Sequence, residues 1–315
     1  MLKALRKSVQ QKILHSTINS MDKAGFGPAL MQHPLTSLDI GARGGAQNDL
    51  MCMARHVDMV GFEPDPEEFT RLQNSAAHGP WKSYTPLPYA LGSRAGEHAL
   101  QLYSKNGCHS LLTARPGIAA LFSRGDYFNP QGQINITVES LDHLIEAGKV
   151  RAADHIKIDV QGWELEVFKG AERTLRRDVL ALRTEVSFFD LYEGQPFFSD
   201  IDAYLRGCGF VLMGFVEAHG WRRRTKTKWP RRAAGPIPYS RGQLMHADAL
   251  YMKTPEHLAD QPAQRLKLGL LAAAYEYCDH AAACFTGMDP VLMQALGRWS
   301  QALKVRRFFP RTAFL

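Results

Sequence analysis

The chain has few cysteines, and their arrangement excludes a disulfide-built domain and a zinc-finger module. Five cysteines are scattered over 315 residues. An odd and widely spaced set makes a poor disulfide framework. No pair has the C-x-x-C spacing typical of a structural zinc site. We therefore expect free thiols in a reducing compartment.

Long apolar runs are also missing. The longest apolar stretch, near residues 268–275, is far shorter than the ~18 residues that a membrane-spanning helix needs. Lys, Gln and His interrupt the apolar positions of residues 1–17, so no signal-peptide core is expected. These features predict a soluble, cytoplasmic protein. Peripheral contact with the inner face of a membrane stays open as an alternative, because the N-terminal segment is basic and amphipathic.

Neither charge nor aromatic content is low enough for disorder. Charged residues make up 22% and aromatic residues 10% of the chain, which excludes wholesale disorder and low-complexity classes. The net charge is +7, and the segment 221–232 alone holds seven Lys and Arg residues and no acid. This local excess favours an anionic partner, such as a phosphorylated or lipid-linked glycan. Nucleic acid is a weaker interpretation, because the basic residues fall in one loop rather than along a stripe.

Between residues 36 and 253, predicted strands alternate with predicted helices. This pattern favours a mostly parallel sheet with helices on both faces. The last two strands have no helix between them, so they should pair antiparallel. The predicted strands are 37–40, 57–62, 84–91, 98–103, 134–138, 156–159, 180–187, 210–215 and 249–253. The predicted helices are 47–55, 66–77, 141–147, 163–176 and 201–207.

The segments outside this alternation suggest three units. Residues 1–33 form an N-terminal helical extension, residues 34–255 the main domain, and residues 256–315 a helical appendage rich in Ala and Leu. The segment 218–247 is predicted to be a basic insertion between the last two strands. The oligomeric state is left open by the sequence.

Two acids follow the first two predicted strands. Asp39 precedes a turn with three glycines, Gly41-Ala-Arg43-Gly-Gly, and glycines let a backbone approach a ligand closely. Arg43 stands where the dinucleotide fingerprint needs its second glycine, which counts against a pyrophosphate. Glu63 lies about 20 residues beyond the turn, where an acid can accept two ribose hydroxyls. The alternatives are an ordinary strand-to-helix turn and a solvated carboxylate.

Further polar groups should reach the same edge of the sheet. Asp159 ends a buried strand, where it could act as a general base, orient a hydroxyl or hold the cofactor's methionine end, or simply cap a helix. Glu185 ends the next strand. The loop 104–110 offers hydrogen-bonding side chains.

Taken together, these motifs resemble the FkbM-type family of S-adenosylmethionine-dependent methyltransferases. Residues 39–45 are similar to the family's D-I-G-A-N-x-G, 62–64 to F-E-P, 90–92 to A-L-G/S, and 156–164 to I-K-I-D-V-E-G-x-E. The resemblance covers about residues 36–253. It implies a Rossmann-like class I methyltransferase fold, an α/β architecture with a mostly parallel seven-stranded sheet, one antiparallel strand and helices on both faces.

The resemblance also implies a set of site residues. The cofactor would be S-adenosylmethionine, and no compact set of metal ligands stands out in the sequence. The implied cofactor residues are Asp39, Gly41, Ala42, Gly44, Glu63, Pro64, Ala90 and Leu91. The candidate catalytic residues are Asp159 and Glu185. The candidate substrate residues are Asn106, His109, Ser110, Gln161, Arg222 and Arg224.

Two departures from the family pattern bear on activity. Arg43 replaces the usual Asn, and Gln161 replaces the usual Glu, which removes a charge but keeps hydrogen-bonding capacity. The favoured function is O-methylation of a hydroxyl on a sugar or glycoconjugate, with Asp159 as base and catalysis chiefly by positioning. The alternatives are a catalytically silent cofactor- or glycan-binding protein, which Gln161 motivates, and an NAD-dependent oxidoreductase.

Overall fold

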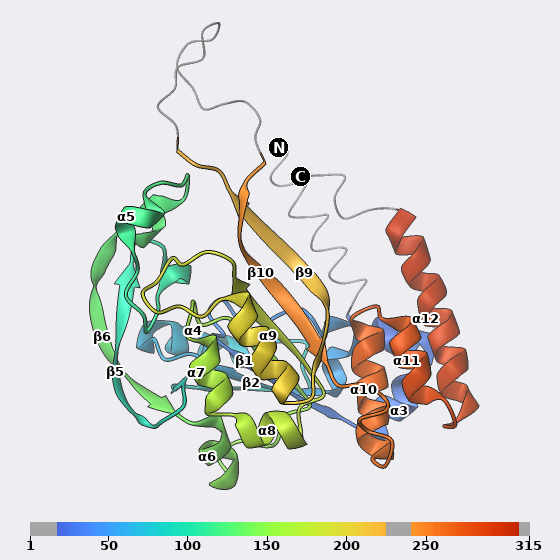
Figure 1. Cartoon of the computed structure of the whole chain (residues 1–315). Helices are drawn as coiled ribbons and strands as arrows, with labels where there is room; N and C mark the ends of the chain where they lie inside the picture. The colour runs from blue at the N-terminus through green and yellow to red at the C-terminus, as the bar shows by residue number, and fades with distance from the viewer. Residues whose placement is uncertain (1–17, 225–240, 309–315) are drawn as a thin grey trace, which may run out of the picture.

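The computed structural model describes residues 18–224 and 241–308, and it is built around one seven-stranded sheet (Figure 1). The sheet has the order β3-β2-β1-β7-β8-β10-β9. Every pairing from β3 to β8 is parallel, and β10 is antiparallel to both of its neighbours. The strands of this sheet are β1 (Leu35–Ile40), β2 (Val57–Phe62), β3 (Ser83–Leu87), β7 (His155–Ile158), β8 (Ala181–Ser187), β9 (Val211–Trp221) and β10 (Gln243–Met252).

This topology confirms the predicted fold class. The chain passes from β1 to β2 and β3 in one direction, and then returns to add β7 and β8 on the other side of β1. The order therefore reverses between β1 and β7. In open α/β sheets a crevice for ligands forms at such a reversal, outside the carboxyl ends of the strands.

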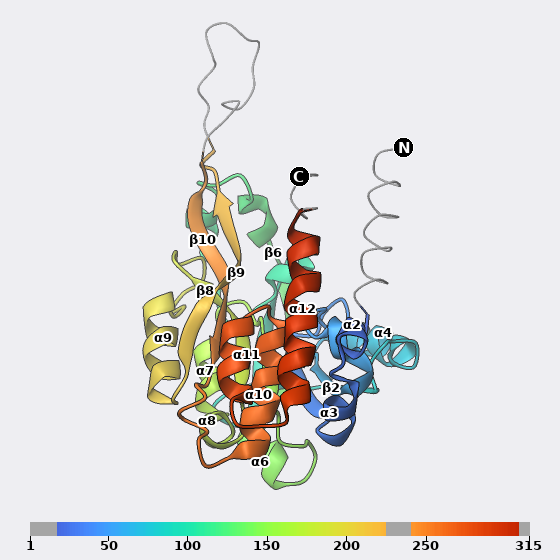
Figure 2. The same ribbon diagram turned by 90° about the vertical axis from the view of Figure 1, so that its right-hand side faces the viewer.

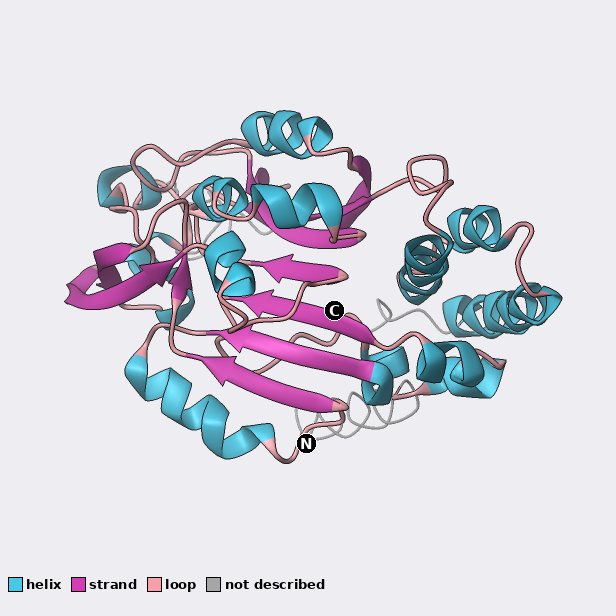
Figure 3. Cartoon of the chain, turned by 90° about the horizontal axis from the view of Figure 1, so that it is seen from below, coloured by secondary structure: helices cyan, strands magenta, loops and turns pink. Residues whose placement is uncertain are grey.

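Helices cover both faces of the sheet (Figure 3). One face packs against α6 (Leu141–Glu146), α7 (Glu164–Lys169), α8 (Glu172–Arg177) and α9 (Phe198–Gly207). The other face packs against α2 (Ser20–Ala24), α3 (Gly27–Gln32), α10 (Pro262–Ala274), α11 (Cys278–Phe285) and α12 (Pro290–Phe308). Helix α4 (Pro66–Ala76) lies beside β3.

The C-terminal helices share a hydrophobic core with the sheet (Figure 2). Trp299 of α12 is buried and donates its indole N–H to Ala273 of α10 at 2.7 Å. Leu250 and Met252 of β10 belong to the same cluster. Burial of these apolar side chains stabilises the packing of residues 256–308 against the central sheet. The predicted domain boundaries stay predictions.

A second, three-stranded sheet was not anticipated. Its strands are β4 (Ala90–Leu91), β5 (Gly96–Tyr103) and β6 (Pro130–Glu139), in the order β4-β6-β5. The prediction of one strand over 84–91 is therefore wrong, because this segment ends β3 at Leu87 and begins β4 at Ala90. Pro88 interrupts the segment. Proline has no N–H to donate to a ladder, so Pro88 leaves a gap between the two pairing segments.

Two predicted helices also differ. The segment 47–55 forms only a 3₁₀ helix, Met51–His56, whose side chains are nearly all buried. The helix predicted over 163–176 is split at Gly170 into α7 and α8. A Cβ at Gly170 would lie 1.9 Å from the Gly92 carbonyl oxygen, so close backbone packing decides this break. Tertiary packing rather than the local pattern of apolar residues determines the conformation of such short, buried segments.

The last hairpin is longer than expected. Strands β9 and β10 extend into the predicted insertion, as far as Trp221 and back from Gln243. Residues 1–17, 225–240 and 309–315 lie outside the described part of the chain. Most of the basic segment and the N-terminal amphipathic segment are among them. Within the described residues, none of the helices combines the length and the apolar character that crossing a membrane requires.

Candidate active site

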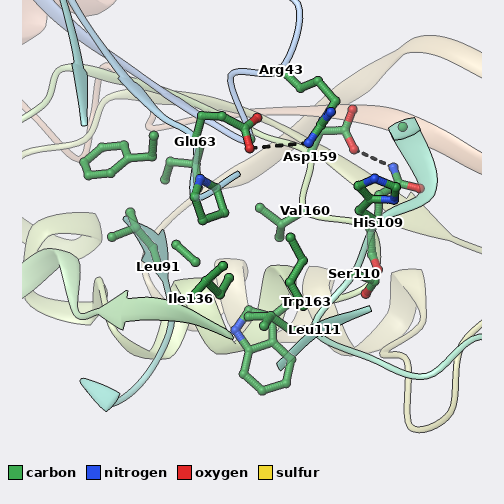
Figure 4. Close-up of a pocket in the computed structure, with 18 of the residues that line it drawn as sticks. Arg43, Glu63, Leu91, His109, Ser110, Leu111, Ile136, Asp159, Val160 and Trp163 are labelled. Carbon is green, nitrogen blue, oxygen red and sulfur yellow. Dashed lines mark hydrogen bonds and ion pairs between the residues drawn. The ribbon is translucent and has the colours of Figure 1, made fainter. Parts of the chain in front are cut away.

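A cavity of about 200 Å³ lies at the carboxyl ends of β1, β2 and β7, closed on one side by the second sheet (Figure 4). It occupies the crevice that the reversal in strand order predicts. Most of the residues predicted for the site line it. They are Gly41, Glu63, Pro64, Ala90, Leu91, Asn106, His109, Ser110, Asp159 and Gln161.

Gly41 allows the loops after β1 and β7 to meet. Its φ is +81°, and a Cβ at this position would lie 2.1 Å from the Asp159 carbonyl oxygen. The Asp159 N–H donates to the Ile40 carbonyl at 3.0 Å, which continues the β1–β7 ladder into the turn. Only glycine combines this conformation with this approach. The first glycine of the motif thus places Asp159 at the cavity.

Asp39 lies behind the cavity wall rather than in it. Its Oδ2 accepts the Gln47 N–H at 2.9 Å, and its Oδ1 lies 3.3 Å from Lys157 Nζ. Burial raises the pKa of Asp39, against the opposing effect of Lys157. Burial lowers the pKa of Lys157, but the Asp39 and Asp159 carboxylates together outweigh it and leave that pKa raised. Asp39 therefore holds the glycine turn and Lys157, and Lys157 itself lines the cavity.

Glu63 is a buried acid in the cavity wall. Its Oε1 accepts the Asp65 N–H at 3.0 Å and lies 3.7 Å from Arg43 Nη2. Arg43 in turn donates to Asp65 Oδ2 at 2.6 Å. Burial raises the pKa of Glu63 to about 7, although Arg43 opposes the shift. Arg43, the departure from the family pattern, thus lies beside the acid and favours its ionised form.

An apolar slot lies opposite the charged residues. Leu91 of β4 and Ile136 of β6 reach it from the second sheet, and Val160 and Trp163 from the loop after β7. Trp163 Nε1 is buried without a hydrogen-bond partner among the described residues. Flat apolar walls with one unsatisfied donor suit a heteroaromatic ring.

Three polar side chains connect the cavity with β8 and β10. Gln161 Nε2 donates to Asp159 Oδ1 at 2.6 Å and to Glu185 Oε1 at 3.3 Å. Glu185 lies behind the wall, and its Oε2 is 2.9 Å from His246 Nδ1. Burial raises the pKa of Glu185; Asp159 adds to the shift and His246 opposes it. The Gln161 amide therefore separates two carboxylates that would otherwise repel each other.

The remaining predicted residues do not line the cavity. Ala42 donates its N–H to the Phe62 carbonyl, and Gly44 donates to Glu68 Oε1 at 2.7 Å, so both shape the turn. Arg224 pairs with Asp126. The backbone of Arg222 accepts the Ser123 N–H. The structure does not bring these two arginines to the cavity.

Sequence reasoning missed several residues of this site. Lys157 is visible in the I-K-I-D motif, but its ion pair with Asp39 depends on the alignment of β1 with β7. Ile136 comes from the unanticipated sheet. His246 meets Glu185 because β10 pairs with β8, and no local pattern reports such a pairing.

The residues of this site fit S-adenosylmethionine. Glu63 offers a carboxylate for ribose hydroxyls, the slot around Trp163 suits adenine, and Asp159 is the acid exposed at the far end of the cavity. The strand order, with its antiparallel β10, is that of class I methyltransferases. The strand order and the cavity together are those of the class I S-adenosylmethionine-dependent methyltransferase fold.

The comparison with known families agrees. Residues 39–212 match the model of the methyltransferase FkbM domain, so the chain belongs to this family. A curated relative, the hexuronic acid methyltransferase AglP of Haloferax volcanii, is 29% identical over 140 residues, which are 44% of this chain and 50% of that protein. The chain thus spans about half the length of this relative.

Two solved structures resemble this chain, with low sequence identity and low TM-scores. The methyltransferase FkbM from Methylobacillus flagellatus KT is 16% identical with a TM-score of 0.38, over 76% of this chain and 50% of that one. The magnesium protoporphyrin IX methyltransferase ChlM from Synechocystis PCC 6803 is 11% identical with a TM-score of 0.36, over 78% and 80%. At such scores, the fold assignment rests on the strand order of this chain.

Proposed function

We propose that this protein transfers a methyl group from S-adenosylmethionine to a hydroxyl oxygen of a sugar or glycoconjugate. The observation that carries the proposal is the Asp159 carboxylate, which lines the cavity and is about one third exposed. Asp159 Oδ1 accepts from Gln161, and its Oδ2 lies 3.9 Å from Lys157 Nζ. A held but accessible carboxylate can accept the proton of a bound hydroxyl.

Some residues of the cavity would bind the cofactor, and Asp159 would accept a proton. When bound, S-adenosylmethionine supplies an electrophilic methyl group with a good leaving group. Glu63 would accept hydrogen bonds from the ribose hydroxyls, and Leu91, Ile136 and Trp163 would enclose the adenine. Asp159 would orient the acceptor hydroxyl and take its proton as the bond from its oxygen to the methyl carbon forms and the methyl–sulfur bond breaks, which releases the neutral thioether. Most of the rate enhancement in such a site comes from alignment.

The contacts of Gln161 support catalysis with Asp159 as the base, rather than a protein that binds the cofactor without transferring the methyl group. Its φ of +55° is unusual for a residue other than glycine, and Ser110 donates to its carbonyl at 2.7 Å. Tyr192 also donates to its side-chain oxygen at 3.4 Å. These contacts direct the amide NH₂ group toward Asp159 and Glu185. A third carboxylate here would crowd like charges, so the neutral amide keeps Asp159 available as a base.

A sugar acceptor is supported by the relative AglP, whose name gives hexuronic acid as its substrate. We infer that the acceptor carries a negative charge, as a uronic acid or phosphorylated glycan does.

The test is transfer of a labelled methyl group from S-adenosylmethionine to a panel of uronic acids, neutral sugars and sugar phosphates. Calorimetry measures cofactor affinity independently of transfer. We expect a labelled methyl ether on at least one anionic sugar. Cofactor binding without label in any sugar would reject the proposed acceptor class, and absence of cofactor binding would reject the assigned cofactor site.

A further inference from the structure

Three acids lie side by side across the outer strands of the sheet. Asp248 of β10 is directly opposite Glu185 of β8 on one side and Glu217 of β9 on the other. Like charges in directly opposed positions destabilise a sheet. Arg183 forms an ion pair with Asp248 at 2.7 Å and another with Asp49 at 2.6 Å, so one guanidinium is shared between two carboxylates. Arg183 alone therefore does not neutralise this row.

A histidine completes the group. His219 follows Glu217 by two residues, so both side chains lie on the same face of β9. Its Nε2 is 3.5 Å from Glu217 Oε1. One ligand atom each of Glu217, His219 and Asp248 can be chosen so that all three lie within 4.8 Å of one another. Two ligands bound to one zinc ion at ~2.1 Å stand about 3.4 Å apart, so only small side-chain shifts are needed.

Neighbouring residues hold two of these side chains in place. The imidazole ring of His219 stacks on that of His246, with centroids 4.5 Å apart and planes 21° apart. Arg183 donates to one oxygen of Asp248 and leaves the other oxygen for a further contact. Hydrogen bonds of this kind commonly orient the carboxylates that bind a metal. Glu217 is the most exposed of the three, because 60% of its side chain is accessible to solvent.

We propose that Glu217, His219 and Asp248 bind a divalent cation. One imidazole nitrogen with two carboxylate oxygens suits Zn²⁺ and Mn²⁺ better than a cation that takes oxygen ligands alone. Three protein ligands leave open coordination positions. The bound cation would also offset the opposed charges of Asp248 and Glu217.

The cation would be connected to the cavity through side chains. A chain of contacts leads from His219 to His246, to Glu185, and then to Gln161 in the cavity wall. Binding of the cation would therefore act on the cavity through His246, Glu185 and Gln161. This use of the cation rests on the proposed function, whereas the cation site itself does not.

The test titrates the chelator-treated full chain with Mn²⁺, followed by the electron paramagnetic resonance signal of free Mn²⁺, and with Zn²⁺, followed by calorimetry. We expect one saturable site. Glu217→Gln and His219→Ala should each weaken binding at least tenfold, the scale of effects usual near a metal centre. His78→Ala, which removes an exposed histidine after α4, is the matched control and should leave binding unchanged.

Glu217→Gln changes an exposed side chain without changing its shape, so folding should be intact. A failure to bind either ion at millimolar concentration overturns the proposal, as does binding that both substitutions leave unaltered. The titration contains neither cofactor nor acceptor. A negative result therefore leaves the proposed methyl transfer standing, and absent methyl transfer would leave the cation site standing.

Discussion

Replacing Glu63 by Gln should affect folding and cofactor binding in opposite directions. The folded protein holds the pKa of this acid at about 7, above its ordinary value of 4.5, because the carboxylate is buried. The contribution of this group to stability is therefore fully present below pH 4.5. It is lost as the pH rises from 4.5 through 7, where half of the buried carboxyl groups are ionised. The amide of Glu63→Gln carries no such penalty. It also lacks the charge that accepts two ribose hydroxyls.

The size of both effects follows from this shift. Relative to low pH, the raised pKa of Glu63 costs the folded state about 3 kcal/mol at pH 8, where the buried group is ionised. It costs about 1 kcal/mol at pH 5, where the folded protein keeps the group protonated although the unfolded chain ionises it. Glu63→Gln should raise the free energy of unfolding by these amounts. In the unmodified protein the ionised fraction is about one tenth at pH 6 and nine tenths at pH 8, so cofactor affinity should increase about tenfold between them.

Urea denaturation without cofactor at pH 5 and pH 8 measures the first effect, and calorimetry with S-adenosylmethionine at pH 6 and pH 8 measures the second. Glu193→Gln, at an exposed acid, is the control and should change neither quantity. If Glu63→Gln stabilises the protein equally at both pH values, or if cofactor affinity does not depend on pH, the assigned role of Glu63 is wrong.

The other predictions concern the loops at the cavity. Asp159→Asn should lower the rate of methyl transfer by about 10²–10⁴-fold, while calorimetry shows an unchanged cofactor affinity. Asp260→Asn, at an exposed acid, is the control. If Asp159→Asn leaves turnover unchanged, Asp159 is not the base. Gln161→Glu should place a third acid between Asp159 and Glu185 and reduce stability by about 1–3 kcal/mol at pH 8, and less at pH 5, in urea denaturation. Gly41→Ala should abolish cofactor binding in calorimetry, because its Cβ would collide with the Asp159 carbonyl. At Gly44 a Cβ meets nothing within 4 Å, so Gly44→Ala should lower the free energy of unfolding only by the backbone strain of about 1–2 kcal/mol. Equal effects of the two substitutions would contradict the close approach assigned to Gly41.

Local motifs were sufficient for the main sheet. Alternating apolar segments and turn residues predicted β1, β2, β7 and β8 close to their observed ends, because buried parallel strands have strong local signatures. The glycine turn and Glu63 were also predicted to meet at one cavity. The carboxyl ends of neighbouring parallel strands lie at the same edge of a sheet, so sequence order sufficed for this expectation.

Local periodicity was insufficient where packing determines the backbone. The helix expected over 163–176 breaks at Gly170, where the Gly92 carbonyl lies too close for any side chain. The second sheet requires β4 to pair with β6, more than forty residues away in the chain. Neither feature has a local pattern, since both depend on contacts between distant segments.

By itself the sequence determined the fold class, the cavity and the acids that border it, because these depend on strand order and on turns that glycine alone permits. Only the tertiary structure decided that Asp39 supports Lys157 from behind the wall, and that Glu185 meets His246. It also brought Glu217 and His219 together with Asp248. Side chains on paired strands become neighbours through the alignment of those strands, and this alignment is set by the packing of the whole sheet.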